Sequence, residues 1–448
     1  MIKVWRPVRG LSVLLLMLGA VAPLWAGGYM IREHSTAALG SAFAGVHAGA
    51  HDLADIFFNP ANLMRSKGRQ AWLGADVLAF HSTFRLQSAT NAAGGVIGGN
   101  PGGNNIAPLS VIPSLYAAWD AGSDLRLGLA VNAPWGLRSE QNAGWVGRYH
   151  ALDSELKTLN ITPMAARRVG DSTVLALGLQ FQQAEATLEN DVDFGLLAAQ
   201  AKVPGARPSL QDGHARISGD DWGNGFVLGL AHEAGPRTRL GLSYRSQVRH
   251  TLRGRGEFTL DAAGMGATLA AATGAFRNTG VRADLNTPAV FGFGLSHQAG
   301  DRWTLLFDAV KTYWSGFEEL RIRFDNPAQP DVVTREEWRD TWFWSLGGSY
   351  RASDRWTWRV GFARDEGPVE DHRRIPRLPT AGCRFVGLGA SCRVAADTTI
   401  DGGVTFVSYD DSPIRLSAAD PTNRAAGNLV GSFDTRLTIY GLSVQHSF

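Results

Sequence analysis

The stretch "LALGLQF", Leu175 to Phe181, alternates large apolar residues with small or polar ones. Ala176, Gly178 and Gln180 separate the leucines and the phenylalanine. Such period-two alternation predicts a β-strand, because successive side chains of a strand point to opposite faces. A soluble β-sandwich turns polar side chains toward water and rarely carries so many glycines. The pattern therefore predicts a membrane barrel, with its large apolar face toward lipid and its small or polar face toward the lumen.

The same alternation recurs in later segments, at Phe226–Leu230, Phe291–Leu295 and Trp358–Phe362. Six short polar connections join the alternating runs, at residues 121–124, 169–172, 234–237, 299–302, 352–355 and 395–398. Each of them predicts a tight hairpin turn. Longer irregular stretches lie between the hairpins, at residues 86–109, 190–220, 261–280 and 411–432. Short turns on one rim and long loops on the other are typical of outer-membrane barrels.

Two terminal strands complete the expected wall. Six turns join twelve strands, and we add a first strand near Gln70–Phe80 and a last strand near Phe433–Phe448. The sequence therefore predicts an all-β fold, a 14-stranded antiparallel transmembrane β-barrel over residues 69–448. An even number of strands returns both chain ends to the periplasmic side.

Aromatic residues fall where the interfacial girdles of a barrel are expected. Indole rings favour the lipid headgroup region, and five tryptophans lie near inferred strand ends: Trp222, Trp303, Trp342, Trp344 and Trp356. The last strand alternates up to the terminal Phe448. An aromatic C-terminus on an alternating strand resembles the assembly signal of outer-membrane barrels, so we expect the barrel assembly machinery as a partner.

The N-terminus has the features of a secretion signal. Basic residues precede an apolar run from Leu11 to Pro23, and Ala26 suits cleavage. The run is shorter than the roughly 20 residues that a spanning helix needs, which disfavours a single membrane anchor. We predict a signal peptide over residues 1–26. The later window Ala262–Phe276 is also too short to span, which excludes a helical inner-membrane transporter.

Charge and cysteine content narrow the functional classes. The formal net charge is +2, which gives no sign of a nucleic-acid partner. The two cysteines, Cys383 and Cys392, are too few for a metal cluster or a disulfide scaffold. Nine residues of extended strand separate them by about 30 Å, so they should not form a disulfide. We expect no cofactor and no metal site.

Residues 27–68 precede the first strand and do not alternate. A 14-stranded barrel has a lumen too wide for wall side chains alone to fill. We therefore predict that this segment folds into the barrel as a plug. Phe57 and Phe58 would be buried in it, and Asn59 with Pro60 would fix a turn.

The stretch "GGYMIREHSTAALGSAFAGVHAGAHDLADIFFNPANL" resembles the N-terminal hatch of the FadL family of outer-membrane transporters. That hatch carries an Asn-Pro-Ala motif, matched here by Asn59, Pro60 and Ala61. Further stretches, "WGNGFVLGLAHEAGPRTRLGLSYRSQV", "DLNTPAVFGFGLSHQAGDRWTLLFDAVKTYWSGFEEL" and "YRASDRWTWRVGFARDEGPV", are similar to later strands of the family. The resemblance implies passive uptake of long-chain fatty acids or other hydrophobic molecules in the outer membrane of a Gram-negative bacterium. It also implies a monomer in contact with outer-membrane lipid or detergent.

The family resemblance implies that two extracellular loops capture the ligand at a hydrophobic groove. In this chain those loops are roughly residues 190–220 and 261–280. The first supplies Phe194, Leu196 and Leu197, and the second supplies Met265 and Leu269. Ordinary loop packing is the alternative explanation for these residues.

The resemblance also implies a pocket under the hatch and a lateral exit at a kink in the third strand. Tyr29 and residues 57–61 are the hatch candidates for ligand contact and gating. The third strand reads "LRLGLAVNAPWGL", and its proline cannot donate to the sheet. We expect a kink at Asn132, Pro134, Trp135 and Gly136. The alternative is that Pro134 merely ends the strand.

Basic residues inside the barrel receive the carboxylate in fatty-acid transporters of this family. Arg321 occupies such a place. Where the fifth strand of relatives carries another basic residue, the approximate match here is Glu185. A lumenal carboxylate would repel a fatty-acid head group, so apolar or aromatic hydrocarbons remain open as ligands.

A barrel enzyme and a general aqueous porin are the two alternatives to uptake of hydrophobic molecules. A lipase-like barrel enzyme needs a catalytic motif, but His232 lacks a second zinc-binding histidine and no Gly-x-Ser-x-Gly elbow is present. His51, Asp52 and Asp55 suit hydrogen bonds that pin a plug better than a catalytic role. A general aqueous porin predicts neither a plug nor an apolar loop pair.

Overall fold

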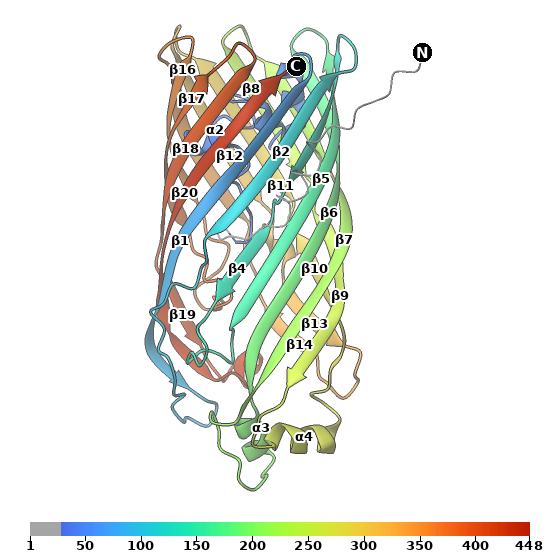
Figure 1. Cartoon of the computed structure of the whole chain (residues 1–448), viewed down its shortest axis with the longest axis vertical. Coiled ribbons are helices and arrows are strands. Elements are labelled where there is room, and N and C mark those ends of the chain that lie inside the picture. Colours follow the sequence, from blue (N-terminus) through green and yellow to red (C-terminus); the bar gives the residue numbers. More distant parts are fainter. Residues whose placement is uncertain (1–27) are drawn as a thin grey trace, which may run out of the picture.

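One antiparallel sheet closes on itself in the computed structural model, which describes residues 28–448 (Figure 1). Strand β1 (Gln70–Thr90) pairs with β20 (Asn428–Ser447) from Gln70↔Ser447 to Thr90↔Asn428. This pairing of first and last strand closes the sheet into a barrel. The expected signal peptide lies outside the described residues.

The wall has fourteen strands, as the sequence predicts, although six of them are interrupted once so that the sheet contains twenty segments. The uninterrupted strands are β1, β2 (Ser110–Asp120), β5 (Asp153–Val169), β6 (Thr173–Asp193), β7 (Asp212–Glu233), β16 (Trp356–Asp365), β17 (Cys383–Arg393) and β20. The interrupted strands are β3 (Leu125–Asn132) with β4 (Gly136–Glu140), β8 (Thr238–Arg245) with β9 (Val248–Thr259), β10 (Thr279–Thr287) with β11 (Val290–Gln298), β12 (Trp303–Thr312) with β13 (Glu319–Phe324), β14 (Val332–Arg335) with β15 (Thr341–Arg351), and β18 (Thr398–Tyr409) with β19 (Ser412–Leu416).

The two rims of the barrel differ as expected. All six predicted hairpin turns occur, and they share one rim with the C-terminus, which we call the turn rim (top of Figure 1). The opposite loop rim carries α3 (Phe194–Gln200) and α4 (Met265–Thr273). No helix of the described chain is both long and apolar enough to cross a membrane.

Several strands run further toward the loop rim than the sequence predicts. β1 continues to Thr90, and the β6–β7 hairpin leaves only residues 194–211 as a loop. The extensions lack the large apolar outer face that marks the predicted strands. Hydrogen bonds between backbones are enough to form a strand there. The alternation of apolar and small residues, which reflects contact with lipid, therefore does not predict these extensions.

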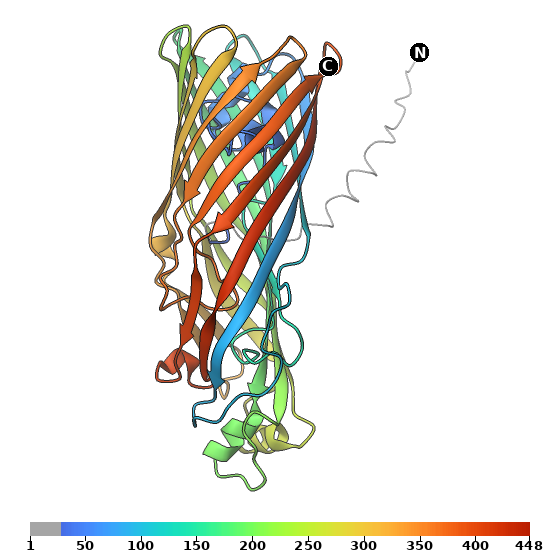
Figure 2. The same cartoon turned by 90° about the vertical axis from the view of Figure 1, so that its left-hand side faces the viewer.

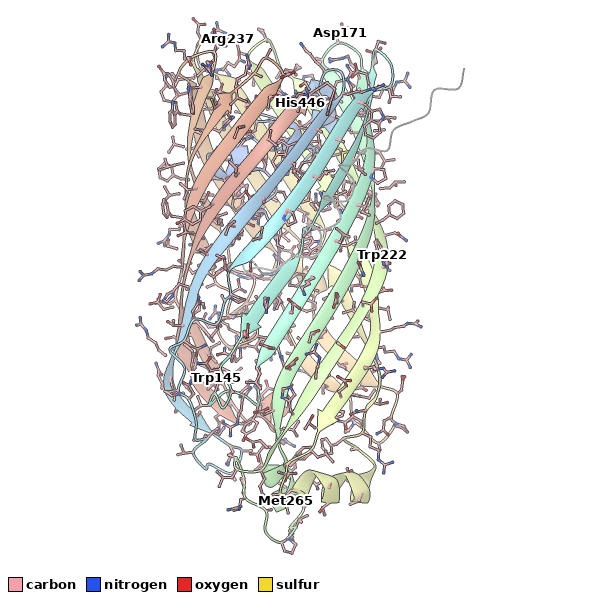
Figure 3. All side chains as sticks on the ribbon, viewed as in Figure 1. Trp145, Asp171, Trp222, Arg237, Met265 and His446 are labelled. Atoms are coloured by element: carbon pink, nitrogen blue, oxygen red, sulfur yellow. The ribbon has the colours of Figure 1, made fainter. Side chains whose placement is uncertain are left out.

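The outer face carries the large apolar residues. Leu177 is 47% exposed, whereas its near neighbour Gln180 is buried. Trp303 and Trp356 begin strands at the turn rim, but Trp222 lies inside β7 and points outward (Figure 3). Trp222 therefore marks the edge of the apolar band rather than the end of its strand.

Glu185 lies on this outer face, which corrects the expectation of a lumenal carboxylate. Its side chain is exposed, as are those of Leu177 and Phe181 at the same parity, whereas Ala184 is buried on the lumenal side. In the register of the sheet, Glu185 lies opposite Lys157 of β5 and Asp220 of β7. It therefore gives no reason to exclude an acidic ligand.

The N-terminal segment, residues 28–66, lies inside the barrel toward the turn rim (Figure 2). It contains α2 (Thr36–Leu39) and two short 3₁₀ helices, Leu53–Ile56 and Pro60–Arg65. Its backbone approaches wall glycines closely: a Cβ at Gly241 would lie 1.8 Å from the His47 carbonyl oxygen, and one at Gly361 would lie 2.0 Å from that of Ser41. The small lumenal face of the alternating strands thus makes room for this segment.

Both cysteines are free thiols on the same strand, β17. Cys383 is buried and Cys392 is partly exposed.

We predict that Leu177→Arg lowers the free energy of unfolding by about 2–4 kcal/mol, because it places a charge in the lipid-facing band. Glu185→Arg on the same face, beyond the band, should change it by less than about 1 kcal/mol. Denaturant titration in lipid vesicles measures both values. Equal losses of unfolding free energy in the two variants would mean that the apolar, lipid-facing band does not end between Leu177 and Glu185.

Candidate functional site

A cavity of about 430 Å³ lies in the lumen between the N-terminal segment and the loop rim; we call it the main cavity. Tyr29 borders it on one side, and Leu197 of α3 borders it on the other. Its walls are largely apolar, with lumen-facing residues that include Leu137, Leu156, Leu252, Leu285, Leu320 and Ile322. This size and lining suit a small hydrophobic ligand, since such pockets span about 300–1,000 Å³.

One arginine stands on the wall of the main cavity. Arg377 belongs to the connection between β16 and β17, which folds into the lumen. Its guanidinium donates to Ser154 Oγ at 3.0 Å, to the Glu189 carbonyl oxygen at 3.2 Å and to Asn190 Oδ1 at 3.1 Å. These acceptors are neutral, and no carboxylate of residues 28–448 lies within ion-pair distance of Arg377. Burial lowers the pKa of Arg377 to about 10, so it remains cationic at neutral pH.

Glu336 lines the same cavity and accepts a hydrogen bond from Trp338 Nε1 at 2.9 Å. Burial raises its pKa to about 7, against the smaller opposing effects of Trp338 and Arg377. Near neutral pH this carboxyl is therefore only partly ionised. It does not cancel the positive charge of Arg377.

Arg321, the arginine that the sequence suggested, lies at a different place. It borders a second cavity of about 590 Å³ at the loop rim, where it pairs with Glu319 at 2.8 Å and Asp331 at 3.3 Å. Arg377 was missed because it lies between strands. The available signal was the apolar, proline-rich context "IPRLP" (375–379), which is unusual for a loop that faces water.

The wall is interrupted beside the main cavity, at the kink that the sequence predicts. β3 ends at Asn132 and β4 begins at Gly136. β2 pairs with β3 only as far as Leu115↔Val131, so its residues 110–114 lack a partner strand on that side. The sheet is open there between two wall strands.

The N-terminal segment supplies the missing backbone partners at the kink. Ile31 N–H donates to the Pro134 carbonyl oxygen at 2.9 Å, and Gly136 N–H donates to that of Tyr29 at 2.8 Å. These bonds flank an antiparallel bridge between Met30 and Trp135. The segment thus bonds to the kink residues from inside the barrel.

Comparisons with known proteins agree with this architecture. The family model described as "Outer membrane protein transport protein (OMPP1/FadL/TodX)" matches residues 17–448. The chain belongs to this family. It is accordingly an outer-membrane protein, and FadL/TodX members are transporters rather than enzymes.

Relatives and solved structures match the chain over most of its length. A putative outer membrane protein of Neisseria meningitidis is 29% identical, covering 97% of this chain and 98% of that protein. The long-chain fatty acid transport protein of Escherichia coli K12 is 24% identical, covering 86% and 88%. A Pseudomonas aeruginosa FadL homologue of known structure is 25% identical, covering 94% and 100%, with a TM-score of 0.85. The Pseudomonas putida toluene transporter TodX shares the fold at 18% identity, covering 94% and 100%, with a TM-score of 0.69.

The FadL-like motif residues of the N-terminal segment contact the wall. Phe57 is buried under the Arg245 guanidinium, 4.5 Å from its ring centre, and Phe58 borders a cavity of about 30 Å³. Asn59 Nδ2 donates to the His47 and Leu230 carbonyl oxygens at 2.8 and 3.0 Å. Of the hatch candidates, Tyr29 borders the main cavity, whereas residues 57–61 do not.

The two predicted capture loops of this FadL/TodX member do meet. Phe194, Leu197, Met265 and Leu269 belong to one apolar cluster, in which the rings of Phe194 and Phe276 lie 5.0 Å apart. Phe194, Leu196 and Leu269 are buried, and Leu197 borders the main cavity together with Val192 and Phe276 of the same cluster.

A Ser-His-Asp arrangement in the N-terminal segment has a structural explanation. Ser41 Oγ lies 2.9 Å from His51 Nε2, and His51 Nδ1 lies 3.2 Å from Asp55. Ser41 is fully buried, and its Oγ also lies within hydrogen-bond distance of the Ala38 and Ala44 carbonyl oxygens, at 3.2 and 3.0 Å. These side chains hold the turns of the segment together, in agreement with the transport role of the family.

We predict that an anionic amphiphile binds the main cavity about 5- to 10-fold more tightly at pH 6 than at pH 8. Protonation of Glu336 through its pKa of about 7 removes a repelling negative charge. Decanesulfonate is a suitable probe because it stays ionised over this range. Titration calorimetry measures the affinity.

Glu336→Gln should give the tighter affinity at both pH values, and decanol should show no pH dependence with either protein. A pH dependence that persists in Glu336→Gln would assign the effect to another group.

Proposed function

We propose that this protein carries amphipathic molecules with an acidic head group and an apolar chain, the class of the long-chain fatty acids, across the outer membrane by passive diffusion. The observation that carries the proposal is the apolar main cavity with Arg377 on its wall, a cation to which no carboxylate of residues 28–448 is paired. A carboxylate would complete the charge-assisted hydrogen bonds of that guanidinium. Several curated relatives are named as long-chain fatty acid transport proteins, which supports this ligand class.

The route begins at the loop rim, which we place outside the cell. The α3–α4 cluster and the cavity beside Arg321 receive the ligand, and Leu197 and Arg377 border both cavities, so the ligand can pass inward. The N-terminal segment acts as the plug that keeps the lumen closed to small solutes. A shift of residues 29–31 would uncover the interruption at Pro134, and the ligand would leave sideways into the membrane.

Neutral monoaromatic hydrocarbons are the ligand class that the toluene transporters of similar fold would suggest. Their identity to this chain is 18%, and a neutral hydrocarbon leaves Arg377 without a role. A general aqueous porin is disfavoured because residues 28–66 occupy the lumen.

The remaining partners are also proposals. Phe448 directly follows β20 at the turn rim and its ring is exposed, so the barrel assembly machinery could bind it there. The closed sheet needs no second copy, so we expect a monomer surrounded by outer-membrane lipid.

We predict that Arg377→Ala weakens oleate binding roughly 10- to 100-fold, because a hydrogen bond to a charged group contributes about 1.5–3 kcal/mol. Binding of oleyl alcohol should stay within about twofold of the unaltered protein, since the alcohol has no charge to satisfy. Arg321→Ala is the matched control, because its charge is already paired. Fluorescence displacement with the purified protein measures all six affinities. Equal losses for acid and alcohol would remove Arg377 from head-group recognition.

We predict that a disulfide between the bridged residues Met30 and Trp135 blocks uptake while ligand binding continues. The bonds around this pair mark it as non-hydrogen-bonded, with a Cα separation near 4.5 Å that suits a disulfide. The variant is Met30→Cys with Trp135→Cys in a Cys383→Ala, Cys392→Ala background. Oleate uptake by cells is compared before and after reduction, so that each variant is its own control. Normal uptake in the oxidised state would place the exit elsewhere.

A further inference from the structure

A row of outward-facing residues crosses five neighbouring strands of the wall, and we call it the arginine row. The register of the sheet defines it: Arg364 of β16 lies opposite Arg384 of β17, Arg384 opposite Ser408 of β18, Ser408 opposite Arg436 of β20, and Arg436 opposite His81 of β1. The five strands lie side by side (Figure 1). Three arginines therefore stand at one height on the outer face of the barrel.

The arginine row lies where the apolar band ends on the side of the loop rim. One step nearer the turn rim, the outward residues of β16, β17 and β18 are Phe362, Val386 and Phe406, and all three are exposed. Trp344 of β15 lies opposite Arg364, and indole rings favour the lipid headgroup region. The arginine row therefore lies at the height of lipid head groups, next to a surface that contacts acyl chains.

Asp410, which follows β18, is shared by two arginines of the row. Its carboxylate lies 2.5 Å from the Arg364 guanidinium and 3.6 Å from that of Arg384. Glu366, which follows β16, accepts the backbone N–H of Trp342 at 2.9 Å instead. Two guanidinium charges thus meet one carboxylate charge. The Arg384 side chain is 71% exposed, so a lipid head group can reach it.

Asp434 of β20 is shared in the same way on the other side of Ser408. Its carboxylate lies 2.7 Å from Arg85 of β1 and 3.9 Å from Arg436, whose side chain is 78% exposed. Each aspartate with its two arginines therefore keeps one positive charge in excess. Neighbouring strands lie about 4.8 Å apart, so Arg384 and Arg436, two strands apart, are about 10 Å from each other along the row.

A second pair of neighbouring arginines on the outer face is neutralised. Arg282 of β10 and Arg323 of β13 lie opposite each other in the register, and both side chains are exposed. Arg282 pairs with Asp325 at 3.6 Å, and Arg323 pairs with Asp284 at 3.0 Å. Each arginine there has its own carboxylate, whereas the arginines of the row share theirs.

Guanidinium groups in excess beside an apolar surface fit a lipid whose head group carries phosphates. A guanidinium binds phosphate through two parallel N–H bonds. Two cationic groups about 10 Å apart suit a head group with two separate phosphates better than a single phosphate. We propose that the arginine row is a binding site for the bisphosphorylated glycolipid of the outer leaflet of the outer membrane.

This site goes beyond the proposed function, and it rests on that proposal only for the orientation of the barrel. With the loop rim outside the cell, the row lies in the outer leaflet. Arg85 and Arg436 stand on the two strands that close the barrel, so a bound lipid bridges that seam. A lipid held across the seam stabilises the closed sheet, because it binds the folded barrel and not the unfolded chain.

The test is native mass spectrometry of the purified protein in detergent with bisphosphoryl lipid A. The unaltered protein should bind one molecule of lipid A. Arg384→Ala with Arg436→Ala should weaken binding at least about tenfold, because hydrogen bonds to charged groups are lost. Arg384→Lys with Arg436→Lys keeps both charges but loses the paired N–H bonds, so its affinity should be intermediate. Arg282→Ala with Arg323→Ala is the matched control and should leave the affinity unchanged.

Four outcomes would contradict the proposal. Equal losses of affinity in the two alanine variants would overturn the arginine row as the site. Equal affinity for lipid A without its phosphates would overturn recognition of phosphate. Phosphatidylglycerol, with its single phosphate, binding as tightly as lipid A would overturn the assignment to the bisphosphorylated glycolipid. Displacement of lipid A by an equal concentration of inorganic phosphate would overturn the assignment to a lipid.

Thermal unfolding gives a second test of the same variants. Lipid A should raise the unfolding temperature of the unaltered protein and of the Arg282, Arg323 control, and should raise it much less in Arg384→Ala with Arg436→Ala. An equal rise in all three proteins would overturn stabilisation through the row.

Oleate affinity separates this site from the proposed function. The arginine row lies outside the lumen, so Arg384→Ala with Arg436→Ala should bind oleate as the unaltered protein does. Failure of the proposed function would appear in the oleate affinity of Arg377→Ala, and failure of the lipid site in the lipid A affinity of the row variants. The two failures are therefore distinguishable.

Discussion

Closure of fourteen strands into one barrel creates a lumen that the wall side chains cannot fill. The N-terminal segment, residues 28–66, packs inside this lumen and fills part of it. Glycines such as Gly241 and Gly361 let its backbone lie against the wall. Polar lumenal residues then satisfy that backbone. Asp308 of β12, for example, accepts the N–H groups of Gly45 and His47. The large residues of the alternating strands therefore face lipid, and the small residues make room for the N-terminal segment inside the barrel.

The interruptions of the wall follow a second constraint, because a buried backbone group without a partner is costly. At the kink around Pro134 the partners come from Tyr29 and Ile31. The same breaks turn aromatic side chains inward, where they surround Tyr29. One short peptide thus bonds to the kink and borders the main cavity, which is why we propose that occupancy of the cavity is linked to opening of the wall.

Electrostatics underlies the preference for acidic ligands that we propose for the main cavity. A guanidinium held by neutral acceptors keeps its positive charge available, and the partly protonated Glu336 opposes it only weakly near neutral pH. Arg321, with two carboxylates beside it, has little capacity left for a ligand. Charge pairing distinguishes these two arginines more clearly than their places in the sequence do.

The sequence by itself determined the strand number, the six turns, the break near Pro134 and the N-terminal segment without strand alternation, because parity and turn chemistry are local properties. Only the tertiary structure decided that Arg377 stands in the cavity and that Tyr29, rather than residues 57–61, borders it. The alternation that puts Leu177 and Phe181 outside also puts Glu185 there, against the approximate family match. An approximate match along a strand can be wrong by one residue, and a one-residue shift moves a side chain to the other face. The inward fold of the Arg377 connection and the convergence of three wall breaks on Tyr29 depend on contacts between residues far apart in the chain. Such contacts exist only once the barrel has closed.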